Sequence, residues 1–147
     1  MNKITKSLIG SSTAVLILRI IIGIVFFAHG AQKVMGWFGG YGLSGTAAYF
    51  QQTWDIPSIF FYMHAFMELL GGIAMVFGIM TRLFSLGLAI NMLIAIILVH
   101  IQQGFFGPEG FEYPLILLIV TTIIFLIGPG RFSLDKAVLV KNNQQIT

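Results

Sequence analysis

Residues 14–32 read AVLILRIIIGIVFFAHGAQ, and this apolar run indicates how the chain folds. It is about as long as the roughly 20 residues with which an α-helix crosses a hydrocarbon core. Similar runs follow at about 59–80, 83–101 and 114–130. The period-2 alternation of a membrane β-barrel is absent from the sequence. We therefore predict an all-α integral membrane four-helix bundle, formed as a single transmembrane domain over residues 1–147.

The composition supports this prediction and excludes several other classes of protein. Of 147 residues, 57% are hydrophobic and only 9% are charged, against about 25% charged residues in soluble domains. So few charges exclude both a soluble globule and a disordered chain. The basic residues are scattered, which excludes a nucleic-acid partner and leaves the lipid bilayer as the main one. The absence of cysteine excludes disulfide scaffolds and iron–sulfur clusters.

The basic residues also predict an orientation. Lys33 alone lies in the connection after the first run, whereas six basic residues lie at the termini or in the turn between the second and third runs: Lys3, Lys6, Arg82, Arg131, Lys136 and Lys141. Cytoplasmic loops carry an excess of Lys and Arg. We therefore expect both termini to lie in the cytoplasm.

Two charged residues fall inside the predicted spans, Arg19 in the first and Glu68 in the second. Each costs about 2.5–3.5 kcal/mol in hydrocarbon on insertion scales, so each should have a partner. At 1.5 Å per residue, their Cα atoms differ by about 10 Å in depth. The sequence leaves two arrangements open: a buried pair between them, or an Arg19 that extends to the cytoplasmic headgroups.

The three histidines are all predicted to lie toward the outer leaflet. His64 precedes Glu68 by four residues and so shares its helix face, while His29 and His100 lie near the outer ends of their spans. They indicate either a polar pocket that binds a ligand or handles protons, or residues that simply lie at the interface. No HExxH spacing occurs, so no metal site is assigned. A haem held by two histidines is a weaker alternative.

Other polar and small residues predict contacts between helices. Asn91, Thr121 and Thr122 are interpreted as interhelical hydrogen bonds. Gly23 and Gly30, and likewise Gly71 and Gly78, are seven residues apart, which indicates a small-residue stripe on each helix. The same stripes would suit a homo-oligomer, so the oligomeric state stays open.

Aromatic residues crowd both outer connections, at 37–54 and 105–113. They favour an interfacial belt, or a lid over a site that opens outward. Within the first connection, residues 46–53 are predicted to form a short interfacial helix capped by Ser44.

The chain resembles the DoxX family over roughly residues 16–134. The resemblance rests on Arg19, on the stretches FFAHGAQK (26–33), GWFGG (36–40) and GTA (45–47), and on ELLGG (68–72), TR (81–82), GFF (104–106), EYP (112–114) and GPG (128–130). It implies a multi-pass protein of the bacterial inner membrane, linked to quinone-dependent redox or to oxidative stress. The family's motif positions are matched here by Arg19, His29, Gln32, Lys33, Glu68, Glu112 and Tyr113.

Together these observations predict a redox-linked membrane subunit that binds a small ligand, with quinone as the candidate, between its helices near the outer leaflet. His29, His64 and Glu68 would supply the ligand with hydrogen-bond donors and a proton acceptor. Arg19 would orient Glu68, and His100 would lie nearby. The chain has no evident redox centre, so electrons would come from a partner subunit or a bound cofactor. No catalytic residue is assigned, and whether the protein is itself an enzyme stays open. The alternative is a non-catalytic scaffold or a small-molecule permease.

Overall fold

The structure is a computed structural model that describes residues 3–55 and 57–138, with side chains from residue 12 onward. These residues form the α-helices Lys3–Met35 (α1), Gly42–Trp54 (α2), Ser58–Phe77 (α3), Thr81–Ala95 (α4) and Glu112–Ile127 (α5). Short helical turns cover Trp37–Gly39 (η1), Ile96–His100 (η2) and Ile101–Gln103 (η3). Within the described ranges there is no strand, which confirms the all-α prediction for them. The side chains of Lys3 and Lys6, and the whole of Lys141, lie outside the described residues.

Three helices are long and apolar enough to cross a membrane. They are Ser12–Met35 within α1, Ser58–Phe77, and Thr81–Gln103, in which η2 and η3 continue α4. Their positions match three of the predicted spans, so the chain is a multi-pass membrane protein.

The fourth apolar helix, α5, is shorter than predicted. It has 16 residues, which corresponds to about 24 Å at 1.5 Å per residue. The helix ends at Ile127 because Gly128 has a φ of 90° that lies outside the helical region, and because the next residue, Pro129, has no N–H to donate. The predicted continuation to residue 130 is therefore wrong.

Glycines bring α1 and α3 into close antiparallel contact. A Cβ built on Gly30 would lie 2.4 Å from the backbone nitrogen of Leu69, and one built on Gly23 would lie 2.8 Å from that of Val76. A step of seven residues forward along α1 thus matches a step of seven residues back along α3. The predicted stripe on the first span is confirmed, because neither position has room for a side chain.

The glycines of α3 do not form the single stripe that was predicted. A Cβ on Gly72 would lie 2.3 Å from the backbone nitrogen of Phe27, so Gly72 completes the contact with α1. Gly71 instead faces Leu88 of α4. Gly78 ends α3 with a φ of +70° and lies against Arg19. A seven-residue spacing therefore identified the close contact on α1 but not on α3.

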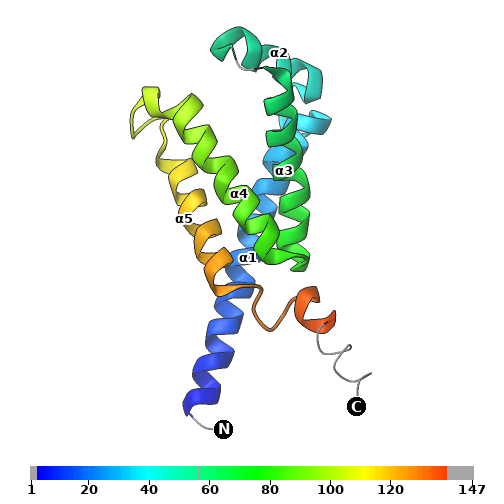
Figure 1. The fold of residues 1–147 in the computed structure, drawn as a ribbon, viewed down its shortest axis with the longest axis vertical. Helices are drawn as coiled ribbons and strands as arrows, with labels where there is room; N and C mark the ends of the chain where they lie inside the picture. Colours follow the sequence, from blue (N-terminus) through cyan, green and yellow to red (C-terminus); the bar gives the residue numbers. More distant parts are fainter. Residues whose placement is uncertain (1–2, 56, 139–147) are drawn as a thin grey trace.

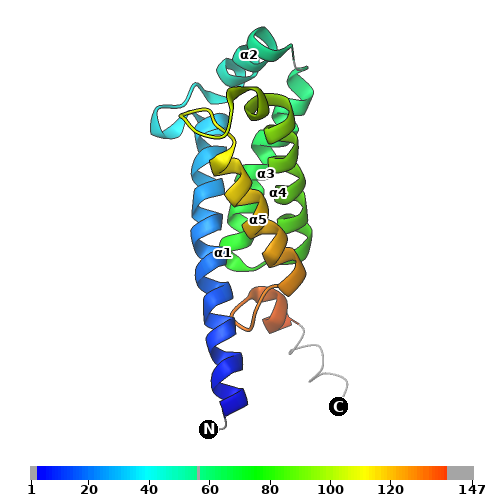
Figure 2. The ribbon, with the colours of Figure 1, turned by 90° about the vertical axis from the view of Figure 1, so that its left-hand side faces the viewer.

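The helices define two ends of the molecule. Figure 1 shows α1 along the whole length, α3 beside it and α2 across the top, while α4 leans away from α3 toward that end. In the perpendicular view of Figure 2, α5 runs obliquely along α4. The start of α1 and the residues after α5 lie at the same end. We call this the terminal end, and the opposite end, with α2 and the connection 101–111, the loop end.

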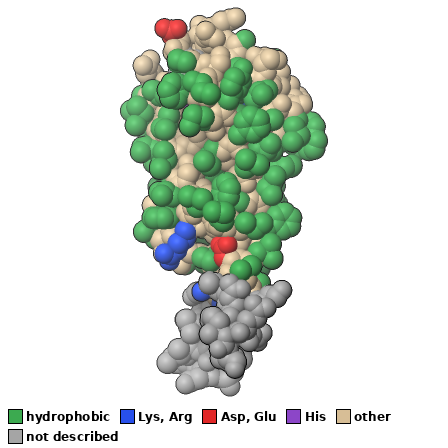
Figure 3. Space-filling view, turned by 45° about the vertical axis from the view of Figure 1, so that its right-hand side comes forward, with side chains coloured by type: hydrophobic (Ala, Val, Ile, Leu, Met, Phe, Trp, Pro, Cys, Tyr) green, Lys and Arg blue, Asp and Glu red, His purple; other side chains and the backbone are tan. Residues whose placement is uncertain are grey.

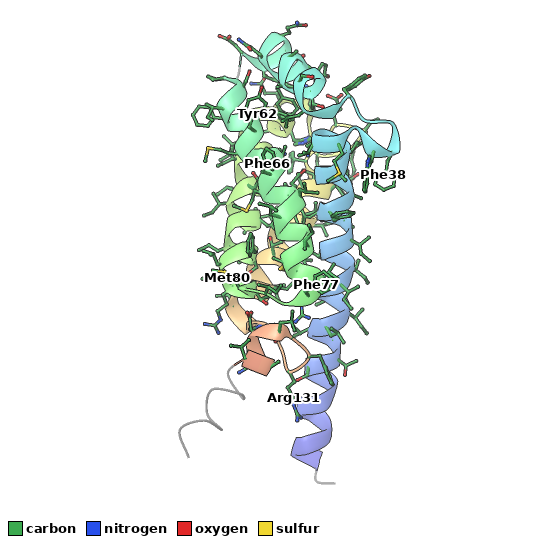
Figure 4. All side chains as sticks on the ribbon, turned by 90° about the vertical axis from the view of Figure 1, so that its right-hand side faces the viewer. Phe38, Tyr62, Phe66, Phe77, Met80 and Arg131 are labelled. Carbon is green, nitrogen blue, oxygen red and sulfur yellow. The ribbon has the colours of Figure 1, made fainter. Side chains whose placement is uncertain are left out.

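Apolar side chains cover the bundle between these ends. Ile17, Ile21 and Ile24 are spaced three or four residues apart on α1, and each is more than half exposed. On the face shown in Figure 3, hydrophobic side chains cover the middle, and the charged side chains in view lie near the ends. Figure 4 places Phe38 at the loop end and Arg131 at the terminal end. Such a surface suits hydrocarbon, with its polar groups at the two boundaries.

The helix α2 covers the loop end. It begins at Gly42, so Ser44 lies inside it and does not cap it, and the helix is longer than the predicted 46–53. On α2, Tyr49 and Phe50 lie with ring centroids 5.3 Å and 5.0 Å from that of Trp54, and Phe50 lies 5.1 Å from Phe61 of α3. These aromatic contacts attach α2 to the top of α3.

Arg19 is buried at the terminal end, where it is 1% exposed. Its Nε donates to the carbonyl oxygen of Met75 at 2.7 Å, Nη2 donates to that of Phe132 at 2.7 Å, and Nη1 donates to that of Pro129. Neither predicted arrangement forms, and Arg19 does not orient Glu68. The last turn of a helix leaves carbonyl oxygens without partners, and the oxygen of Met75 is one of those that Arg19 satisfies.

Asp135 forms a second set of hydrogen bonds at the terminal end, with the start of α4. Its Oδ1 accepts the N–H of Met80 at 2.7 Å, and its Oδ2 accepts that of Thr81 at 2.9 Å. The N–H of Asp135 donates in turn to the carbonyl oxygen of Gly78 at 3.0 Å. A carboxylate is favourable at a helix N-terminus, so this residue caps α4 from a distant point in the sequence.

Candidate ligand-binding site

A cluster of polar side chains from three helices lies in the half of the bundle nearer the loop end. Lys33, in the last turn of α1, forms an ion pair with Oε2 of Glu68 on α3. His64 lies one turn earlier on α3, with its Nε2 3.2 Å from Oε1 of Glu68 and 3.2 Å from Nζ of Lys33. The Glu68 side chain is 4% exposed. Its charge is therefore balanced by Lys33, which the antiparallel register of α1 and α3 places opposite it.

Asn91 of α4 sets which nitrogen of His64 carries the proton. Its Nδ2 donates to the backbone oxygen of His64 at 3.4 Å, which turns Oδ1 toward the imidazole Nδ1, 2.9 Å away. An amide oxygen only accepts, so Nδ1 is the donor. The Nε2 of a neutral His64 then accepts from Lys33, whereas a protonated Nε2 donates to Glu68. Nε2 therefore has a partner in the cluster whether it accepts or donates a hydrogen bond.

The cluster borders a cavity of about 380 Å³ that extends toward the loop end. Such a volume is typical of small-molecule sites, whose walls are largely apolar with a few polar groups. The residues that line it are Phe26, His29, Lys33, Tyr49, Phe50, Trp54, Phe60, Phe61, His64, Glu68, Met92, Ile94, Ala95, Leu98, Val99, His100, Gly107, Pro108, Glu109, Gly110, Tyr113, Pro114 and Leu117.

Two further histidines lie on the cavity wall. Nε2 of His29 on α1 is 3.3 Å from the hydroxyl oxygen of Tyr113 on α5, so this pair joins the two helices. Nδ1 of His100 lies 2.8 Å from the carbonyl oxygen of Glu109 and donates to it, which draws the connection 101–111 over the cavity. His100 ends the π turn η2, and such turns occur frequently at functional sites.

The structure separates the residues that were predicted as candidates. Five of them besides Glu68 line the cavity: His29, Lys33, His64, His100 and Tyr113. Arg19 lies at the terminal end, Gln32 packs beneath Gly40, and Glu112 lies in the first turn of α5, none of them on the cavity wall. The aromatic residues of α2 line the cavity, as the lid interpretation requires, whereas Trp37, Phe38 and Tyr41 do not.

The sequence prediction was incomplete for Asn91 at this site and wrong for two threonines that do not line the cavity. It predicted for Asn91 only a contact between helices, which is confirmed, and did not connect it with His64. It also predicted interhelical bonds for Thr121 and Thr122, but their hydroxyls donate to carbonyl oxygens of α5 itself. Thr and Ser often bond the carbonyl three or four residues earlier in a helix, so this prediction was wrong.

The described residues contain no group of three or more His, Asp or Glu side chains placed to hold a metal ion. The side chains on the cavity wall supply ammonium and imidazole groups, a carboxylate and aromatic rings. The fold and the cavity define a multi-pass membrane protein with a ligand-sized site near the loop end.

Comparison with known proteins identifies the family. The model of the DoxX family matches residues 14–101. The chain is 36% identical over 124 residues to "Putative oxidoreductase CatD" of Bacillus subtilis, with 84% of this chain and 85% of that protein covered. The chain therefore belongs to the DoxX family.

Two further relatives are named as membrane proteins. "Uncharacterized membrane protein Rv3486" of Mycobacterium tuberculosis is 29% identical over 136 residues, with 84% of this chain and 80% of that protein covered. "Inner membrane protein YqjF" of Escherichia coli is 27% identical over 127 residues, with 83% and 89% covered. No solved structure matches the chain.

Proposed function

We propose that the chain is a redox-linked membrane subunit whose cavity binds a quinone-like aromatic carbonyl compound. The observation that carries this proposal is the cavity itself, in which apolar and aromatic walls meet the Lys33–His64–Glu68 cluster. The oxidoreductase name of the Bacillus subtilis relative supports a redox role in the same direction.

The chemistry of a quinone fits the groups on the wall. Its carbonyl oxygens accept hydrogen bonds, which the ammonium of Lys33 can donate because it has three N–H groups. Reduction of a quinone to a quinol takes up two electrons and two protons. The electrons would come from a partner redox subunit, and His64 would pass protons because both of its protonation states have partners in the cluster.

The aromatic residues of the cavity suit the ring of such a ligand. Tyr49, Phe50 and Trp54 of α2 lie over the cavity, with Phe61 of α3 beside them. Aromatic pairs in stacked or edge-to-face arrangements contribute about 0.5–1.5 kcal/mol beyond the area they bury. The lid would therefore hold a planar ring while the cluster orients its carbonyl groups.

Trp54 provides the test, because it lines the cavity and the other tryptophan, Trp37, does not. The Trp37→Phe variant in nanodiscs is titrated with a benzoquinone that has no tail, and saturable quenching of Trp54 fluorescence is expected. Glu68→Gln should weaken this binding at least tenfold, and Asp55→Asn, an exposed carboxylate outside the cavity, should leave it within twofold.

The result distinguishes the proposal from the scaffold alternative. If quenching is not saturable, the cavity does not bind this ligand and the proposal fails. If Glu68→Gln lowers the amount of folded protein but leaves the affinity of the purified protein unchanged, the cluster is structural and the scaffold alternative is favoured.

A further inference from the structure

We propose that the ligand of this cavity carries an apolar chain and reaches the site from the lipid phase, through a gap between α3 and α4. This inference rests on the proposed function, since it concerns the same cavity. It names the class of ligand as a compound dissolved in the bilayer, in contrast to one that arrives from water.

The first observation is that one wall of the cavity is also the outer surface of the bundle. Phe60 on α3, and Ile94 and Leu98 on α4 and η2, line the cavity. The same three residues are 59%, 48% and 47% exposed. A residue that borders the cavity and faces outward marks a place where the wall is one side chain thick.

The arrangement of the helices explains why the gap lies here. α3 and α4 meet at the turn around Gly78 and separate as they approach the loop end (Figure 1). His64 and Asn91 join the two helices at the level of the cluster. Phe60 lies one helical turn beyond His64 toward the loop end, where the helices have moved apart.

The cavity has other exposed wall residues, but they are Tyr49 and Tyr113, which carry hydroxyl groups, and residues 107–109 of the connection. Its floor is formed by the buried side chains of Phe26, Met92 and Leu117. The hydrogen bond between His29 and Tyr113 joins α1 to α5, and the bond from His100 to Glu109 holds the connection above. The gap between α3 and α4 is therefore the apolar way out, and hydrocarbon lies beyond it.

The dimensions fit a ligand with a polar ring and a tail. Glu68 and Phe60 are eight residues apart on α3, which is about 12 Å along the helix axis. A single ring bound at the cluster lies wholly inside this distance, whereas a longer chain extends through the gap. An apolar chain that remains among lipid tails avoids exposure to water, so the gap favours a tailed ligand.

The experiment compares two benzoquinones with the same ring, one without a tail and one with a decyl tail, by quenching of Trp54 in the Trp37→Phe background. Leu98→Phe fills part of the gap. It should weaken binding of the decyl compound at least fivefold more than it weakens binding of the compound without a tail. Ile90→Phe is the matched control, because Ile90 is an exposed residue of α4 that does not line the cavity.

A decyl quinone with a photoreactive group at the end of its tail then locates the chain in the unsubstituted protein. Cross-links at residues 60, 94 and 98 support the inference. Cross-links confined to α2 or to residues 104–110 overturn it, because the tail then points to the aqueous side. If the compound without a tail also fails to quench Trp54, the proposed function itself fails; if it binds and Leu98→Phe affects neither compound, the inference alone fails.

Discussion

At the terminal end the buried charge of Arg19 is surrounded by backbone oxygens, whereas at the loop end the buried charge of Glu68 is surrounded by ionisable side chains. Arg19 bonds to three carbonyl groups that cannot change their charge. Glu68 meets Lys33 and His64 beside a cavity. The buried charge at the terminal end thus joins segments of the backbone, whereas the buried charge at the loop end belongs to the site proposed to bind a ligand.

The largest expected effect comes from removing the charge at the terminal end. Arg19→Met leaves three carbonyl oxygens without their donor, and each unsatisfied buried group costs about 1–3 kcal/mol. We expect the free energy of unfolding to fall by about 3 kcal/mol or more, measured by denaturant unfolding in detergent. Quinone affinity of the folded fraction should remain within twofold.

Arg82→Met is the matched control, since Arg82 is an exposed arginine at the same end. Surface substitutions of this kind change stability by about 0.5 kcal/mol or less. Equal losses of stability for the two variants would contradict the role assigned to Arg19.

A smaller effect on stability is expected at the loop end. Breaking a buried ion pair by removing one partner is strongly destabilising, whereas replacing both partners with apolar residues is often neutral. Lys33→Met and Glu68→Met should each lower the free energy of unfolding by about 3 kcal/mol, the low end of the range for a broken buried pair, because the Lys33 side chain is 18% exposed. The double variant should recover most of the loss. Unfolding experiments on the four proteins of this cycle measure the coupling.

In the double variant, stability should recover but ligand binding should not. All three variants should lose at least tenfold in affinity for the quinone without a tail, by quenching of Trp54. A double variant that is stable and still binds would show that the pair does not contact the ligand.

The sequence predicted the three long spans well, because hydropathy over some 20 residues depends little on tertiary contacts. It did not predict the partner of Glu68. Lys33 was assigned to the connection after the first span. The helix α1 extends to Met35, however, so Lys33 lies in its last turn. Gly23 and Gly30 set the register between α1 and α3, and this register brings Lys33 opposite Glu68. The spacing of these glycines was therefore the sequence signal that could have predicted the pair.

The histidines predicted a polar pocket between the helices, but the sequence did not predict the shape of the cavity. It depends on how far α3 and α4 separate and on where α2 folds back, and both result from packing between residues far apart in the chain. The left-handed conformation of Asp55, with a φ of 52°, ends α2 so that the chain can turn into α3. No local sequence pattern predicted this turn.

The smallest expected effect concerns Asn91. In Asn91→Leu the Nδ1 of His64 loses its acceptor, so the proton can move to Nε2 and the nitrogen that faces Lys33 is no longer fixed as an acceptor. We expect quinone affinity to fall by about three- to tenfold, corresponding to roughly 1 kcal/mol for one hydrogen bond. The ¹⁵N chemical shifts of the two His64 ring nitrogens, measured by NMR with and without Asn91, report the tautomer population directly. An unchanged tautomer population would contradict the proposed role of Asn91.

The bonds at the terminal end impose an order on biosynthesis. Pro129, Phe132 and Asp135, which supply partners to Arg19 and to the start of α4, are synthesised after every helix that they hold. Arg19 is therefore synthesised more than 100 residues before two of its three carbonyl partners, on Pro129 and Phe132. A nascent chain stalled before residue 129 would contain α1 to α5 but would lack these bonds at the terminal end.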